Sequence, residues 1–326
     1  MRYASIDVGT NTLRLLIAEA DGGGGGAGGG IRPILYRRAI TRLGGAYTES
    51  EGIDASSAQR AFAALEGFAT VIAGAGVDEV HATATSVVRR AVNRDWFVEE
   101  AARRTGIRLR VITGDTEARL SLLGVLSVVD PGNGSRLVID IGGGSTEYIA
   151  ADGTEPAGAW SMEMGVVHLT EARLASDPPR DAELASMEAD IKAVLEELKG
   201  RMRLDGVPPE GFSAPAGASF VGTAGTITTL AAIDMDLPVY DRERINNHTL
   251  TKKRVSGLYR YLAKLTLKER KGILSLEKGR EDLIIAGTAI TLLSMDAFGF
   301  EEITVSDAGL LEGIIIDRVA DINRKA

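Results

Sequence analysis

The stretch that decides the fold runs from Leu137 to Ala150 and reads LVIDIGGGSTEYIA. An apolar run of β type ends at Asp140, three glycines and two hydroxyl residues follow, and the chain turns apolar again after Glu147. Glycine backbone can curl tightly and direct several N–H groups at one anion. Carboxylates beside a phosphate commonly hold Mg²⁺. The stretch therefore predicts a phosphate-and-metal hairpin, although a glycine-rich turn without a ligand would have the same composition.

A second copy of this pattern stands near the N-terminus. Residues 5–17 read SIDVGTNTLRLLI, in which Asp7 corresponds to Asp140 and Gly9 to Gly142. The two copies lie about one domain apart in the chain. Strand-rich hairpins that alternate with helices in both halves favour a duplicated α/β protein with mixed sheets. We therefore expect two similar domains whose hairpins lie across one cleft.

The composition is that of a globular protein without thiol chemistry. The 326 residues are enough for about two domains, with 44% hydrophobic and 25% charged residues. The sequence contains 0 Cys and three widely separated histidines, so the only metal it invites is a hard ion with oxygen ligands. A net charge of −8 argues against a nucleic-acid partner. We expect no membrane partner and a cytoplasmic location, because no leader or spanning stretch is visible.

Turn-forming residues mark the expected domain boundary. The run DPGNG at 130–134 is the strongest break in the chain. It predicts a first domain over residues 1–130 and a second over residues 131–307, with a helix over 308–326 that packs back on the first domain. The almost pure glycine run at 21–30 predicts a surface loop of no assigned role.

Polar side chains at predicted strand ends could carry the chemistry. Asp7 and Asp140 are expected to hold one Mg²⁺ against a di- or triphosphate, directly or through water. Glu117 stands in the first turn of a predicted helix and is a candidate base, although a helix-dipole glutamate would occupy the same place. Backbone N–H groups, hydroxyls and one arginine are the expected phosphate contacts. They are Thr10, Asn11, Thr12, Arg89, Gly142, Gly143, Gly144 and Ser145.

A third run of small residues precedes another predicted helix. Gly222, Thr223, Ala224 and Gly225 form a loop that permits close approach of a flat or anionic ligand. With the two D-x-G loops, this pattern resembles the sugar kinase/Hsp70/actin ATPase superfamily, and within it the Ppx/GppA phosphatases. The matching stretches follow one another along nearly the whole chain. They are 6–12, 84–89, 113–118, 140–147, 164–171, 221–230, 279–282 and 305–307.

The resemblance implies a two-domain actin-like (ribonuclease H-like) fold with an active site in the interdomain cleft. It implies hydrolysis of a terminal phosphoanhydride with Mg²⁺ or Mn²⁺ as the metal. By position, Glu117 resembles the catalytic base, Glu147 a glutamate that positions water or metal, and Asp140 a metal-site aspartate. Arg89 and the two Gly/Ser/Thr loops resemble phosphate contacts.

The resemblance also leaves alternatives open. Arg90 stands where the family often has Glu and His168 where it often has Arg, which affects nearby phosphate contacts. The expected substrates are inorganic polyphosphate, with short chains favoured because a C-terminal helical part is lacking, and pppGpp. A kinase of the same superfamily is one alternative, and a non-enzymatic sensor of pppGpp or ppGpp is another. A homodimer is also considered.

Overall fold

The computed structural model describes residues 1–20, 30–45, 47–129 and 134–325. The chain divides into two compact units, which we call unit 1 (residues 1–127 and 308–326) and unit 2 (residues 128–307). Residues 130–133 of the expected boundary and residues 21–29 of the expected glycine loop lie outside the described residues. Each unit has its own sheet and its own hydrophobic core.

Unit 1 is built on a five-stranded sheet with the strand order β3-β2-β1-β4-β5. Its strands are β1 (Arg2–Val8), β2 (Thr12–Ala20), β3 (Ile31–Ile40), β4 (Glu79–Ala84) and β5 (Leu109–Val111). Its helices are α1 (Ala55–Gly74), α2 (Ser86–Arg90), α3 (Arg94–Thr105), α4 (Gly114–Val125) and α12 (Leu310–Lys325).

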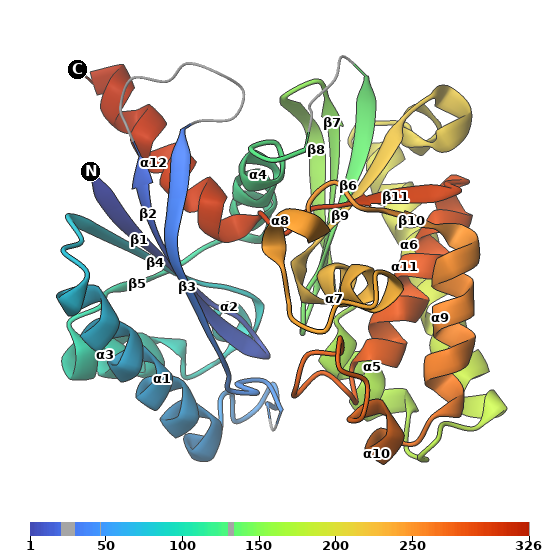
Figure 1. The fold of residues 1–326 in the computed structure, drawn as a ribbon, viewed down its shortest axis with the longest axis horizontal. Coiled ribbons are helices and arrows are strands. Elements are labelled where there is room, and N and C mark those ends of the chain that lie inside the picture. Colours follow the sequence, from blue (N-terminus) through green and yellow to red (C-terminus); the bar gives the residue numbers. More distant parts are fainter. Residues whose placement is uncertain (21–29, 46, 130–133, 326) are drawn as a thin grey trace. The chain divides into compact units, whose positions relative to one another are not determined.

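Different helices cover the two faces of this sheet (Figure 1). Successive residues of a strand point to opposite faces. Ile6 of β1 belongs to a cluster with Phe62 of α1, whereas Tyr3 belongs to a cluster with Ile315 of α12. Helix α12 also approaches α4 very closely, because a Cβ at Gly313 would lie 1.7 Å from the carbonyl oxygen of Leu120. The last helix of the chain therefore completes the core of unit 1.

Unit 2 is built on a six-stranded sheet with the strand order β10-β11-β9-β6-β7-β8. Its strands are β6 (Ser135–Ile141), β7 (Thr146–Asp152), β8 (Glu155–Met162), β9 (Ser219–Thr223), β10 (Thr249–Thr251) and β11 (Glu302–Val305). Its α-helices are α5 (Val166–Arg173), α6 (Asp181–Leu204), α7 (Ala224–Asp234), α8 (Arg242–Ile245), α9 (Lys252–Lys264), α10 (Leu267–Arg270) and α11 (Ile284–Phe298), and short 3₁₀ helices cover Pro209–Phe212 and Ala214–Ala216.

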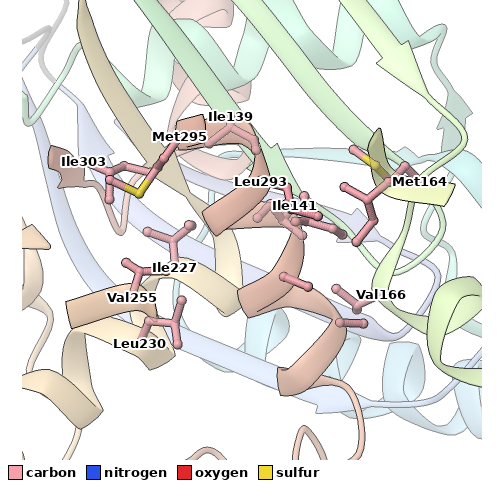
Figure 2. Packing of buried hydrophobic residues seen from close by; sticks show 14 of the residues in the cluster. Ile139, Ile141, Met164, Val166, Ile227, Leu230, Val255, Leu293, Met295 and Ile303 are labelled. Carbon is pink, nitrogen blue, oxygen red and sulfur yellow. The ribbon is translucent and has the colours of Figure 1, made fainter. Parts of the chain in front are cut away.

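The core of unit 2 lies between the sheet and the helices that cover it. Helix α11 is buried along most of its length, which explains why its sequence is apolar on every side. Figure 2 shows part of this core, including Ile139 of β6, Ile227 of α7 and Met295 of α11. This packing fixes the positions of β6 and β9, and both strands end beside the glycine hairpin of residues 140–147.

The two sheets repeat one plan. Strands β3-β2-β1-β4-β5 of unit 1 correspond in order and direction to β8-β7-β6-β9-β11 of unit 2. Even the irregularities correspond: the register shifts between Ile17 and Ala18 of β2, and between Ala150 and Ala151 of β7. Both positions lie ten residues beyond the aspartate of their hairpin. The predicted duplicated α/β fold is therefore confirmed.

The contact between β4 and α12 makes a testable contribution to the stability of unit 1. Arg318 donates to Glu79 through Nε at 2.7 Å and Nη2 at 3.1 Å. These hydrogen bonds hold the pKa of Glu79 below its ordinary value of 4.5. Because the folded pKa is lowered, the contribution is fully present above the unfolded value and is lost as the pH falls through the folded one.

We therefore expect Arg318→Gln to lower the free energy of unfolding at neutral pH, by an amount that shrinks as the pH falls below 4.5. Chemical denaturation at a series of pH values measures this difference. Arg324→Gln, on the exposed side of the same helix, is the matched control and should show a smaller difference. A difference for Arg318→Gln that stays constant with pH would contradict the ion-pair account.

Candidate functional site

A row of polar side chains crosses the sheet of unit 2 at its hairpin. Thr223 of β9, Asp140 of β6, Glu147 of β7 and Ser161 of β8 are directly opposed from strand to strand. Directly opposed residues share a sheet face, with Cβ atoms about 4.5–5.5 Å apart. Asp140 and Glu147 are only 9% and 2% exposed. Two carboxylates thus stand side by side out of water, which is costly unless a cation or hydrogen-bond donors neutralise them.

This carboxylate pair fits a hard divalent cation. The Ser161 hydroxyl donates to Glu147 Oε1 at 2.8 Å and so orients that carboxylate. Within the described part of the chain, no three His, Cys, Asp or Glu side chains gather in a way that could hold a metal. Mg²⁺ is often bound by only one or two carboxylates, with substrate phosphate and water completing its shell. Asp140 and Glu147 are therefore the residues that would hold it.

The corresponding row in unit 1 has a cation in the position of the second carboxylate. Arg14 of β2 faces Asp7 of β1 at the position that Glu147 has opposite Asp140. Its guanidinium donates to Asp7 Oδ2 through Nη2 at 2.7 Å and Nε at 3.0 Å. Asp7 therefore has a cation as its cross-strand partner where Asp140 has a second carboxylate. The pair of carboxylates is thus found in unit 2, and a metal role for Asp7 stays a prediction.

The glycine loop of unit 2 is held by helix α5. The carbonyl groups of Gly142 and Gly143 accept hydrogen bonds from the N–H groups of Val166 and Val167 at 3.1 and 2.9 Å. In a planar trans peptide the N–H group points opposite to the carbonyl. The N–H groups of Gly143 and Gly144 are therefore directed away from α5. Two adjacent amides directed to one side are able to donate to one anion.

The peptide groups of the unit 1 hairpin are also fixed by hydrogen bonds to their carbonyl groups, here from segment 41–44. The carbonyl of Thr10 accepts from the Gly44 N–H at 2.9 Å, and that of Asn11 accepts from the Thr41 N–H at 3.0 Å. The N–H of the Thr10–Asn11 peptide consequently points away from segment 41–44. Thr10, Asn11 and Thr12 are all buried. Both predicted phosphate loops thus have a conformation imposed from outside the hairpin.

The predicted base and a predicted phosphate contact form an ion pair. Arg89 Nη1 donates to Glu117 Oε2 at 2.9 Å and to the carbonyl oxygen of Ile112 at 3.1 Å. The side chains of Arg89 and Glu117 are 23% and 11% exposed. Glu117 lies in the first turn of α4, whose N-cap Thr113 accepts a hydrogen bond from the Thr116 N–H. Sequence reasoning assigned these two side chains separate roles and missed their contact, because 28 residues separate them.

The prediction of a loop at Gly222–Gly225 is wrong in its local structure. Gly222 and Thr223 belong to β9, and Ala224 and Gly225 are the first residues of α7. Strand and helix meet without a linker because Ala224 takes a left-handed φ of 68°. Such a conformation is costly for a residue with a Cβ, and residues of this kind cluster at functional sites. The small residues serve a sharp strand-to-helix junction.

An arginine absent from the predicted site covers this junction. The guanidinium of Arg280 lies directly against Gly225, where a Cβ would come within 2.0 Å of Nη2. Arg280 Nε also donates to Glu277 Oε2 at 2.8 Å. The signal was present in the matching stretch 279–282, but nothing in the sequence joins it to Gly225. An arginine–glutamate ion pair therefore lies beside the N-terminus of α7.

The two departures from the family pattern lie at the surface. The guanidinium of Arg90 lies 5.5 Å from the centre of the Tyr47 ring, and His168 is exposed on α5.

A cavity of about 520 Å³ lies between α6, α9 and α11, lined by residues such as Leu195, Tyr259 and Leu292. None of the predicted site residues lines it. Among the described residues, no helix is both long and apolar enough to cross a membrane.

Two sheets of one topology, each with an Asp-x-Gly hairpin at the end of its first strand, define a two-domain actin-like α/β protein. A family model described as "Ppx/GppA phosphatase family" matches residues 16–321. The chain therefore belongs to the Ppx/GppA phosphatase family, as its resemblance to that family predicts.

The similarity to individual relatives extends over nearly the full length of both proteins. "Exopolyphosphatase 2" of Mycobacterium tuberculosis is 32% identical, with 97% of this chain and 98% of that protein covered. The crystal structure of the Aquifex aeolicus Ppx/GppA family member superposes with a TM-score of 0.80 at 30% identity and covers 99% of both chains. An exopolyphosphatase from Cytophaga hutchinsonii gives a TM-score of 0.86 at 25% identity over 98% of both chains.

Proposed function

We propose that this protein is an exopolyphosphatase that uses a divalent metal to release the terminal phosphate of inorganic polyphosphate. The observation that carries the proposal is the loop at Gly142–Ser145, whose amides are directed to one side beside a buried pair of carboxylates. Anion-binding amides and metal-binding carboxylates are the two features that a phosphoanhydride requires. The family and the names of the full-length relatives support the same activity.

The unit 2 hairpin would bind the end of the polyphosphate chain. The N–H groups of Gly143 and Gly144, with the Ser145 hydroxyl, would donate to the oxygens of the terminal phosphoryl group. Asp140 and Glu147 would hold Mg²⁺ or Mn²⁺, which when bound neutralises the charge of the phosphate oxygens. In phosphoryl transfer most of the catalysis comes from such positioning and charge stabilisation.

Glu117 would accept a proton from the attacking water. The ion pair with Arg89 orients the Glu117 carboxylate at the start of α4. The water oxygen forms a bond to the terminal phosphorus, the bridging P–O bond breaks, and its electron pair leaves with the shortened chain. The released products are inorganic phosphate and polyphosphate that is one unit shorter.

A second candidate substrate is pppGpp. The observation that favours it is the Arg280 guanidinium on Gly225, because a planar cation can pair with phosphate oxygens or stack on a base. The same hydrolysis would convert pppGpp to ppGpp. A cytoplasmic location, a homodimer and the absence of nucleic-acid and membrane partners stay predictions.

Glu147→Gln tests the metal assignment. Removing one charge of the pair is expected to raise the Mg²⁺ concentration needed for half-maximal phosphate release by at least about tenfold. Replacing a residue that only orients a metal ligand already weakens metal binding by about that factor. Phosphate release from tripolyphosphate across a Mg²⁺ titration measures the shift. Glu155→Gln, an exposed carboxylate on the neighbouring strand, is the control and should leave the titration unchanged. An unchanged titration for Glu147→Gln would remove this residue from the metal site.

A further inference from the structure

Arg270 is a buried arginine whose guanidinium is surrounded by backbone carbonyl groups. Its side chain, at the end of α10, is 5% exposed. Nε donates to the carbonyl oxygen of Glu281 at 2.7 Å, and Nη1 donates to that of Leu262 at 3.3 Å and to that of Leu265. The guanidinium thus joins the C-terminal end of α9 to the segment that precedes α11.

These contacts are unusual for a charge that is withdrawn from water. The carboxylate of Asp177 lies 3.5 Å from Arg270 Nη2, near the limit of a hydrogen bond, and its side chain is 47% exposed. Burying a charge costs free energy that a carboxylate at close range usually offsets. Here three carbonyls take most of the donors. A planar fork that reaches three carbonyls in different directions is a means of fixing backbone, and an ammonium group cannot reproduce it.

The backbone that Arg270 fixes is the backbone that carries Arg280. The Glu281 carbonyl is one residue beyond Arg280. The Arg280 carbonyl itself accepts from the N–H groups of Leu283 and Ile284, each at 3.0 Å, where α11 begins. Arg270 adds a hydrogen bond to this turn from a residue outside it. Because the Arg280 guanidinium lies directly against Gly225, a small shift of the turn would move it away from the β9–α7 junction.

We propose that Arg270 is a positioning residue, which holds the backbone at Glu281 and thereby keeps the Arg280 guanidinium on Gly225 to meet an anionic substrate. The inference rests on the proposed function and adds to it that Arg280 contacts the polyphosphate chain. It predicts that Arg270 acts on substrate affinity and does so through Arg280. A residue needed only for folding would change the melting temperature and leave substrate affinity unchanged.

A double-mutant cycle of Arg270→Lys and Arg280→Ala tests the proposal. KM and kcat for tripolyphosphate are measured together with the melting temperature. We expect Arg280→Ala to raise KM about tenfold, as loss of a charged contact to phosphate does. Arg270→Lys should raise KM several-fold with kcat within about twofold, and the double variant should be no worse than Arg280→Ala alone. Arg260→Lys, an exposed arginine on α9, is the control and should change nothing.

Two outcomes would overturn the inference. One is a lowered melting temperature for Arg270→Lys with an unchanged KM, which would make the residue purely structural. The other is a KM effect that adds fully to that of Arg280→Ala. If Arg270→Lys does not fold, Arg270→Gln, whose amide can still donate to one carbonyl, replaces it in the cycle. If the wild type releases no phosphate, the proposed function fails, and calorimetric binding of tripolyphosphate to the same variants still decides the role of Arg270.

Discussion

Replacing Glu117 with glutamine is expected to lower phosphate release from polyphosphate by a factor of about 10²–10⁴. Glutamine keeps the size of the side chain and can still accept a hydrogen bond from Arg89, but it cannot take a proton from water. Because Glu117 is assigned to the attacking water and not to the phosphate chain, the affinity for polyphosphate should change only a few-fold. The expected signature is therefore a large loss in kcat with a nearly constant KM.

The matched control for this substitution stands two residues earlier. Asp115 lies in the same first turn of α4 and is exposed, so Asp115→Asn changes the same helix terminus without touching Arg89. Phosphate release at saturating tripolyphosphate compares the two variants with the wild type. Near-normal turnover in Glu117→Gln would show that another group activates the water. An equal loss in Asp115→Asn would indicate a general effect on the helix instead of a base.

Replacing Gly165 with alanine is expected to destroy the phosphate loop of unit 2. A Cβ at this position would lie 2.3 Å from the carbonyl oxygen of Gly143 and 2.4 Å from the carbonyl carbon of Gly144. Both contacts are with backbone, which cannot rotate away. Either α5 or the loop must move, and the hydrogen bonds from Val166 and Val167 are lost. We expect the free energy of unfolding to fall by about 2–4 kcal/mol and phosphate release to be lost even in folded protein.

Gly200 supplies the control for this steric prediction. It lies inside α6, and a Cβ there would meet no atom within 4 Å. Gly200→Ala should raise the free energy of unfolding by about 0.5–1 kcal/mol, because alanine favours helix more than glycine does. Urea denaturation of both variants, followed by phosphate release assays in buffer, measures both effects. An unfolding free energy for Gly165→Ala equal to that of the wild type would contradict the close contact of α5 with the loop.

The hairpins could be predicted from the sequence because each one is formed by residues that lie close together in the chain. An apolar run, an aspartate and glycines in order determine strand, turn and strand within about fifteen residues, and the second copy confirms the first. The exchange of Arg14 for Glu147 was also available from the sequence, because both residues stand seven positions after their aspartates. Aligning the two copies to that point distinguishes the hairpin with two carboxylates from its counterpart.

Contacts between distant segments could not be predicted in the same way. The pairing of Arg89 with Glu117 depends on how α2 and α4 follow their strands, and that of Arg280 with Gly225 depends on how α11 packs on α7. The small residues at 222–225 indicated a loop because glycine is common in loops. In the structure they relieve crowding instead: a Cβ at Gly222 would lie 2.7 Å from Ile303 Cδ1. Composition alone does not distinguish the two causes.

The most direct test of the central claim is phosphate release from short polyphosphate, long polyphosphate and pppGpp, assayed in parallel with and without Mg²⁺. We predict Mg²⁺-dependent release from polyphosphate by the wild type and its loss in Glu117→Gln. Tight binding of pppGpp or ppGpp without any release would contradict hydrolysis and favour a sensor. Consumption of ATP that requires an added acceptor, with no release from polyphosphate, would contradict it in favour of a kinase.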